Sequence, residues 1–153
     1  RAELADSKSQ QVVLRDQLQI AQDESLQYAQ LVLDQLELEM MFRTEASELT
    51  GAGQKRLAGL AAFLVNNPQI SIRLDGYADP RGDAGYNRDL SLARVSHVAR
   101  VLQEQGVELS RIATYSHGSS NSTANQGDYD AYALERVVKI NLQQDPNRGL
   151  AAR

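Results

Sequence analysis

The chain has 153 residues, which is enough for one domain with a hydrophobic core and one appended segment. Its net charge is −4, which argues against nucleic acid as the main partner because phosphate binding needs a concentrated basic surface. Cysteine is absent and the two histidines lie far apart in the sequence. Disulfides, thiolate chemistry and cysteine-ligated metals are therefore excluded, and we expect no histidine-rich metal site.

No run of about 18 apolar residues occurs, so we expect no membrane-spanning helix in the chain. The chain begins at Arg1 rather than Met and shows no signal-peptide pattern. We therefore expect an excised piece or a mature fragment, with any targeting or anchoring segment outside it. A membrane would be contacted only through such outside segments.

Residues 2–35 are expected to form a helical arm, because they contain neither Gly nor Pro and are rich in Gln, Leu, Asp and Glu. Ten positions alternate steps of three and four, and six of them are apolar, which favours an amphipathic helix and, more weakly, a coiled coil. The ten are Leu4, Ser7, Gln11, Leu14, Leu18, Ala21, Ser25, Tyr28, Val32 and Gln35. Three partners for this helix stay open: the following domain, a second copy in a homodimer, or sequence outside the chain.

The rest of the chain alternates strand and helix patterns. Apolar and polar alternation predicts strands at 69–75, 112–116 and 137–142, while 36–42 fits either a strand or a continued helix. Helical spacing predicts helices at 53–66 and 91–106 and a short helix at 128–135. With 36–42 counted as a strand, the order βαβαβ(α)β indicates an α+β sandwich with helices on one face of the sheet. Residues 143–153 are expected to be a loosely ordered tail.

An acid and a base lie on either side of the predicted start of the second helix. Ser91 is the expected N-cap and Gly106 the expected C-cap, which places Arg94 in the first turn. Asp79 lies in the loop that follows the strand at 69–75. A zwitterionic ligand needs such a pair, one group for its ammonium and one for its carboxylate. Alternatively, Asp79 caps a turn and Arg94 is solvated, or the two pair with each other.

The segment from Gly76 to Arg94 resembles the signature of the OmpA-like (OmpA/MotB/Pal) C-terminal peptidoglycan-binding domain. The matching residues are Gly76, Tyr77, Asp79, Gly82, Asn87, Leu90, Ser91 and Arg94, and matches continue at 106–107, 110–112 and Gly118. The resemblance covers 36–142 and implies that 36–42 is the first strand of a mixed sheet. It divides the chain into an arm (1–35), an OmpA-like domain (36–142) and a flexible tail (143–153).

In this family, the residues matching Asp79 and Arg94 hold the diaminopimelate of the cell-wall stem peptide. The resemblance therefore implies that these two residues bind this ligand here. It also implies that Asn87 orients the loop or reaches the ligand carboxylate. Leu90 and Ser91 would line the pocket.

Several positions near the implied site depart from the family pattern. Ala78 stands where the family has a Thr, and Arg43 where it often has an acid or Asn, with Glu45 two residues on as a compensating charge. Arg136 matches the first Arg of a family segment near the site, but Val137 replaces the second. The alternative for Arg136 is a surface charge on an edge strand.

The resemblance implies a non-catalytic module that binds peptidoglycan and anchors an envelope protein or the outer membrane to the wall. It implies no cofactor. The module's location would be the periplasm of a Gram-negative-type bacterium. We expect no enzyme, because no signature pairs a Cys or Ser nucleophile with a His base and none sets two carboxylates across one bond. His97 and His117 are interpreted as structural or surface residues. The alternative function is an OmpA-like assembly module that has lost wall binding and acts through its helical arm.

Overall fold

The computed structural model describes residues 2–120 and 122–145. The chain divides into two compact units, residues 1–35 and 36–153, and each is described by itself. The first unit is a single helix, α1 (Ala2–Gln35), which confirms the predicted helix. Its consecutive Val12, Val13 and Leu14 are each more than half exposed, so its apolar residues do not form one narrow stripe. The coiled coil stays a prediction.

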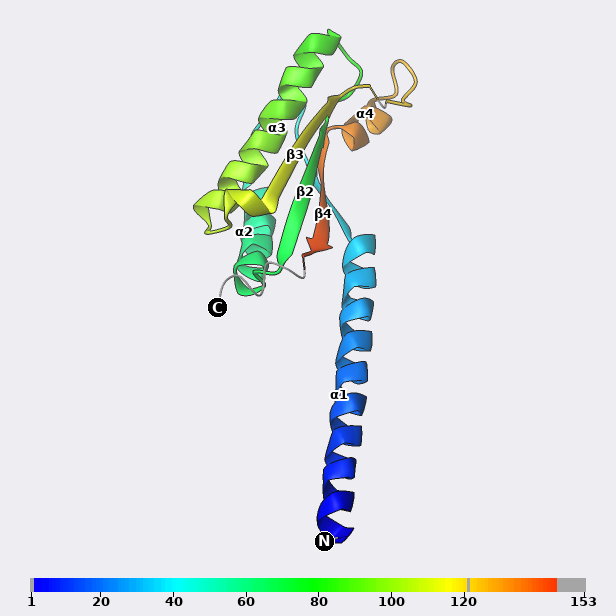
Figure 1. The fold of residues 1–153 in the computed structure, drawn as a ribbon. Coiled ribbons are helices and arrows are strands. Elements are labelled where there is room, and N and C mark those ends of the chain that lie inside the picture. Colours follow the sequence, from blue (N-terminus) through cyan, green and yellow to red (C-terminus); the bar gives the residue numbers. More distant parts are fainter. Residues whose placement is uncertain (1, 121, 146–153) are drawn as a thin grey trace. The chain divides into compact units, whose positions relative to one another are not determined.

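The second unit is built on a four-stranded mixed sheet (Figure 1). Its strands are β1 (Glu37–Met41), β2 (Ile70–Tyr77), β3 (Ile112–Gly118) and β4 (Val137–Gln144), in the order β1-β4-β2-β3. β2 and β3 are parallel, whereas β4 is antiparallel to both β1 and β2. All four predicted strands are confirmed.

Strand pairing carries several strands beyond their predicted ends. β2 extends to Tyr77 and β3 to Gly118, which lie opposite each other. β4 runs on because Gln143 and Gln144 pair with the start of β2. The predicted tail therefore begins too early, and its residues 146–153 lie outside the described part of the chain.

The helices α2 (Gly51–Asn66) and α3 (Ala84–Glu104) cover one face of the sheet (Figure 1), which confirms the α+β sandwich. A single 3-10 turn, η1 (Leu109–Arg111), and the short α4 (Tyr129–Glu135) complete the unit. Alternate residues of β2 and β4 point toward the helices and form the core with them. This core includes Leu57, Ala61, Leu64, Ile70, Ile72, Leu74, Val95, Val98, Leu102, Val138, Ile140 and Leu142. None of the helices in the described residues is both long and apolar enough to cross a membrane.

The predicted start of α3 at Ser91 is wrong. The helix begins seven residues earlier, where the side chain of Asp83 accepts the Tyr86 backbone N–H at 3.1 Å as the N-cap. Ser91 is fully buried within the helix. Its hydroxyl donates to the Arg88 carbonyl at 2.9 Å and accepts the Gly118 N–H at 2.9 Å. Ser91 therefore ties α3 to the end of β3 instead of capping the helix.

The other helix ends differ from expectation by one or two residues. The C-cap of α3 is Gln105, and Gly106 follows it with a φ of 106°, in the left-handed region that favours glycine. α2 begins at Gly51, where Thr50 accepts the Gly53 N–H at 3.3 Å. In each case the hydrogen-bonded cap sets the boundary.

Gly76 permits a close approach between β2 and α3. A Cβ at this position would overlap the Val95 side chain and lie 2.6 Å from the Ser91 carbonyl oxygen. The sheet and the helix therefore pack backbone against backbone at the end of β2.

We expect Gly76→Ala to lower the free energy of unfolding by about 1–3 kcal/mol, because α3 must shift to admit the methyl group. Gly59→Ala on exposed α2 is the matched control, since no atom lies within 4 Å of its Cβ position. The control is expected to raise the free energy of unfolding by about 0.5–1 kcal/mol. Urea denaturation followed by circular dichroism measures both, and an unchanged stability of Gly76→Ala would contradict the close approach.

Candidate functional site

Several chain segments meet at one edge of the sheet (Figure 1). β1 ends beside the start of β4 because these strands are antiparallel, and β2 and β3 end side by side because they are parallel. The loop after β1 (43–50) and the loop after β2 (78–83) therefore leave the sheet at the same edge. α3 begins there too, immediately after the second loop.

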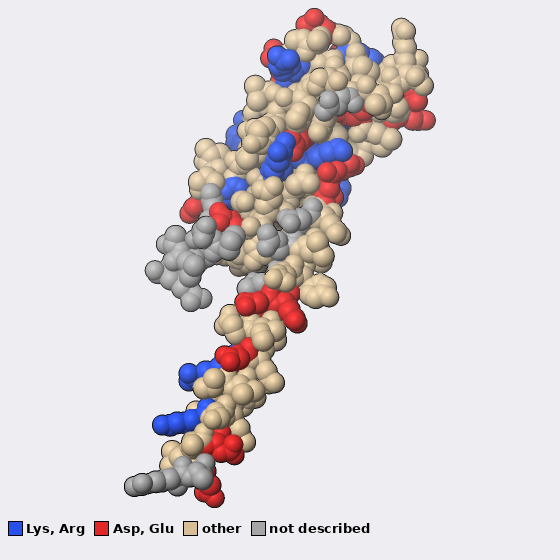
Figure 2. Space-filling view, turned by 45° about the vertical axis from the view of Figure 1, so that its right-hand side comes forward, with Lys and Arg blue, Asp and Glu red and all other residues tan. Residues whose placement is uncertain are grey.

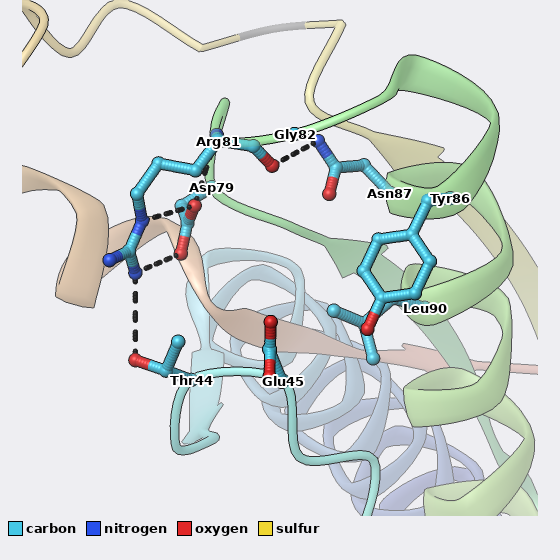
Figure 3. A pocket seen from close by; sticks show the side chains of 8 residues that line it. All are labelled: Thr44, Glu45, Asp79, Arg81, Gly82, Tyr86, Asn87 and Leu90. Atoms are coloured by element: carbon cyan, nitrogen blue, oxygen red, sulfur yellow. Dashed lines mark hydrogen bonds and ion pairs between the residues drawn. The ribbon is translucent and has the colours of Figure 1, made fainter.

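A pocket of about 180 Å³ opens at this edge (Figure 3). It is lined by Thr44, Glu45, Asp79, Arg81, Gly82, Tyr86, Asn87 and Leu90. Asp79 and Arg81 lie on one side of it, and Tyr86 and Leu90 of α3 lie on the other. The lining thus offers carboxylates, a guanidinium and an amide next to an apolar wall.

Asp79 is a nearly buried carboxylate, with 8% of the residue exposed. The Arg81 guanidinium donates to both of its oxygens, from Nε to Oδ1 at 3.0 Å and from Nη2 to Oδ2 at 2.8 Å (Figure 3). The Arg81 backbone N–H also donates to Oδ1, at 3.1 Å. The Arg136 guanidinium lies 3.5 Å from Oδ2. Asp79 is therefore paired within the chain, but with Arg81 and Arg136 rather than with Arg94.

Two opposing effects act on the pKa of Asp79. Burial raises it, because a charged carboxylate is poorly solvated there. The hydrogen bonds and positive charge of Arg81, together with the Arg136 hydrogen bond, outweigh burial and hold the pKa of Asp79 below its ordinary value of 3.8. The carboxylate is thus ionised at neutral pH.

Arg94 does not lie at the start of a helix, so that part of the prediction is wrong. It lies about three turns into α3, is fully buried and is not among the residues that line the pocket. Its guanidinium donates to three carbonyl oxygens, of Ala46 at 2.8 Å, Tyr77 at 3.1 Å and Arg43 at 3.2 Å. Arg94 therefore clamps the loop after β1 to the end of β2.

Arg94 nevertheless interacts electrostatically with charged residues at this edge of the sheet. Burial, followed by the positive charge of Arg136, lowers the pKa of Arg94 to about 10, and the Asp79 carboxylate acts in the opposite direction. Arg94 is thus charged at neutral pH and close enough to both residues for their charges to affect it.

The remaining predicted residues occupy different places. Leu90 lines the pocket, whereas Ser91 is buried behind it. Asn87 lines the pocket and donates its side-chain amide to the Arg81 carbonyl at 3.0 Å, which holds the loop after β2 (Figure 3). Ala78 is buried and borders a separate cavity of about 530 Å³.

Arg136 is no edge-strand surface charge, so that alternative is wrong. It is the C-cap of α4, immediately before β4, which is an inner strand of the sheet. Its side chain is only 14% exposed. Its Nε donates to the Phe42 carbonyl at 3.1 Å, which joins the end of β1 to the Asp79 pair.

Sequence reasoning missed Arg81, which has more contacts to Asp79 than any other described residue. The available signal was local: Arg81 stands two residues after the acid, between Pro80 and Gly82. Gly82 has a φ of 86°, so the chain turns sharply and folds the Arg81 side chain back over Asp79.

Neither histidine belongs to the pocket. His97 accepts the Leu49 backbone N–H at 3.3 Å, and His117 lies 2.7 Å from an Asp75 oxygen on the sheet face away from α2 and α3. Within residues 2–120 and 122–145, no three His, Asp or Glu side chains cluster closely enough to hold a metal ion.

The charged surface is mixed rather than of one sign. On the face shown in Figure 2, Lys and Arg side chains lie among Asp and Glu side chains. This face therefore lacks the concentrated basic patch that a polyanionic partner would need.

We expect Arg94→Met to lower the free energy of unfolding by about 3 kcal/mol, because three carbonyl oxygens lose their donor while the side-chain volume is kept. Arg88→Met is the control, since Arg88 is an exposed residue of the same helix. It should change stability by no more than about 0.5 kcal/mol. Equal effects of the two substitutions in urea denaturation would refute the clamp.

The depressed pKa of Asp79 predicts a pH-dependent stability. Since the folded-state pKa lies below the unfolded value, the ion pair stabilises the fold fully above about pH 4. This contribution is lost as the pH falls through the folded-state pKa. The gap in unfolding free energy between the wild type and Asp79→Asn should therefore shrink below pH 4, as measured by urea denaturation from pH 7 to pH 2.5. A gap that stays constant over this range would mean that the pair does not stabilise the fold.

Comparison with known proteins places the chain in a family. Residues 41–134 match the OmpA family. The probable lipoprotein YiaD of Escherichia coli K12 is 35% identical over 101 residues, which cover 66% of this chain and 46% of that protein. The peptidoglycan-associated lipoprotein of Agrobacterium fabrum is 30% identical over 97 residues, covering 63% and 55%. The chain thus spans about half the length of these two curated relatives.

The fold has a close counterpart among solved structures. The crystal structure of the peptidoglycan-associated lipoprotein from Burkholderia pseudomallei matches with a TM-score of 0.65 and 27% identity, over 69% of this chain and 89% of that chain. The family match covers more than half of the 153 residues. The chain therefore belongs to the OmpA family.

Proposed function

We propose that this chain binds peptidoglycan without catalysis, through the diaminopimelate of the stem peptide, and anchors an envelope protein or the outer membrane to the wall. One observation carries the proposal: a nearly buried carboxylate, Asp79, lies at a pocket among three guanidinium groups. Arg81 and Arg136 contact it, and Arg94 is close enough to interact with its charge. A ligand with one ammonium and one carboxylate needs both kinds of group.

Diaminopimelate in a stem peptide has a free ammonium and a free carboxylate on one carbon. We assign the ammonium to Asp79 and the carboxylate to Arg94, with Asn87 and Arg136 beside it. A guanidinium has five N–H donors, and three hydrogen bonds to described carbonyls use three of those on Arg94. For Arg94 to contact the ligand, the loop at 43–46 must admit the carboxylate.

The names of the related proteins support wall binding. Two of the similar proteins are peptidoglycan-associated lipoproteins, and another is a probable lipoprotein. We extend wall binding and a periplasmic location to this chain as part of the proposal. In it, residues 36–142 are the wall-binding domain, which β4 extends to Gln144, and 1–35 are an arm that pairs with a second copy.

The test is calorimetric titration with a muropeptide that contains diaminopimelate and with one that contains lysine in its place. The wild type is expected to bind the first more tightly, because lysine lacks the second carboxylate. Asp79→Asn should weaken binding about ten- to a hundred-fold, since it removes the charge that meets the ammonium. Added salt should weaken wild-type binding as well.

Asp75→Asn is the matched control. Asp75 is as buried as Asp79 and accepts the same two-pronged pair from Arg73, at 2.8 and 2.9 Å, but does not line the pocket. It should leave the affinity unchanged. If the folded wild type gives no heat with either muropeptide, wall binding is refuted. The alternative of an assembly module would then be tested by sedimentation of the intact chain.

A further inference from the structure

The Asp79 carboxylate has no acceptor position left for an incoming ammonium. A carboxylate offers about four acceptor positions on its two oxygens. Oδ1 accepts the backbone N–H and Nε of Arg81, and Oδ2 accepts Nη2 of Arg81 and, at the longer distance of 3.5 Å, Nη1 of Arg136. An ammonium can therefore reach Asp79 only if one of these donors leaves.

The donor best suited to leave is the Arg81 side chain. It is 37% exposed, whereas the Arg136 side chain is 14% exposed and also donates to the Phe42 carbonyl. The Arg81 backbone stays fixed meanwhile, since its carbonyl accepts from Asn87 and its N–H donates to Asp79 (Figure 3). Departure thus needs only rotation of a partly exposed side chain, not movement of the loop.

The Arg81 guanidinium also contacts residues other than Asp79. The Arg81 guanidinium carbon is 5.0 Å from the ring centre of Tyr132 and 5.7 Å from that of Tyr129. These distances are within the range of cation–π attraction. Nη2 also lies 3.5 Å from the hydroxyl of Thr44, which lines the pocket too. None of these contacts involves Asp79, so the Arg81 side chain has other groups nearby to bind when it releases the carboxylate.

We propose that Arg81 is an internal stand-in for the ligand ammonium, which holds Asp79 in the unliganded protein and must be displaced when an amino-acid zwitterion binds. This proposal rests on the proposed function, because it takes the Asp79 pocket as the ligand site. It makes Arg81 a residue that sets affinity and specificity from within the pocket. Its removal should make Asp79 more available, in contrast to removal of a residue that holds the ligand.

The test compares Arg81→Gln with wild type in calorimetric titration with the diaminopimelate muropeptide. Arg81→Gln is expected to bind roughly two- to ten-fold more tightly, because no ion pair has to be broken. Arg81→Lys keeps the charge but loses the two-pronged geometry, and a smaller gain is expected. Arg73→Gln is the matched control: it breaks the equivalent Asp75 pair outside the pocket, removes the same charge and should change nothing.

A readout without ligand tests the pair itself. Carbon-13 NMR of the Asp79 carboxyl should show its pKa rising in Arg81→Gln, since Arg81 is the main group that lowers it. An unchanged pKa would overturn the proposal, because Arg81 would then not hold Asp79 in solution. Circular dichroism and urea denaturation verify that each variant is folded.

The outcomes separate the two proposals. Wild type that binds while Arg81→Gln binds equally or more weakly overturns the stand-in and leaves wall binding in place. A gain in Arg73→Gln as large as that in Arg81→Gln also overturns it, since net charge alone would then explain the effect. Binding by Arg81→Gln where the wild type shows none refutes wall binding by the wild type and supports the stand-in. Absence of binding in every variant overturns both.

Discussion

The pocket depends on a buried guanidinium that is bound by backbone carbonyls instead of by an acid. Arg94 joins the loop after β1 to the end of β2 through the carbonyls of Arg43, Ala46 and Tyr77. These segments are far apart in the chain, and both border the pocket. Carbonyl dipoles compensate the buried charge only while all three stay in place, so the clamp and the shape of this edge form together. If removal of Arg94 abolished binding, the loss could come from a missing contact to the ligand or from disruption of the pocket. Asp79 and Arg81 can be changed without removing the clamp.

A second buried arginine of the same unit also donates to backbone carbonyls. Arg111 is buried and donates to the carbonyls of Leu64, Asn67 and Ile70, where α2 ends and β2 begins. Each arginine donates to several carbonyls where the chain leaves regular secondary structure, and three of these carbonyls, of Arg43, Leu64 and Asn67, also accept a backbone N–H. The fold thus uses one long side chain to fix the connection at each end of β2, and the strand carries Asp79 just beyond one of them.

How far the sequence predicts the structure depends on the range of the interaction. Three of the strands and the bodies of the helices follow from local periodicity, whereas the strand at 36–42 is assigned through the family resemblance. Asp79 is correctly expected just past a strand. The start of α3 is mistaken because Ser91 and Asp83 are both acceptable caps, and the choice depends on Ser91 bonding Gly118, which is distant in sequence. The role of Arg94 has no sequence signature at all, since any residue supplies a carbonyl. The pairing of Arg81 with Asp79 could have been predicted from the sequence, because the two residues are close in the chain and a turn around Gly82 folds Arg81 back over the acid.

The pairing of Asp79 with Arg81 affects the selectivity between a simple amine and a zwitterion as well as the affinity for each. In the proposed binding mode, any amine that reaches Asp79 must break the same two bonds to Arg81. A simple amine replaces the bonds between Arg81 and Asp79 with its own bond to Asp79, so the net binding free energy is small. In the proposed binding mode, a zwitterion also brings a carboxylate to Arg94, with Asn87 and Arg136 beside it. The pair between Arg81 and Asp79 therefore weakens the binding of both ligands, but the zwitterion still binds more tightly than the simple amine. Selectivity then arises from competition with Arg81 rather than from added contacts.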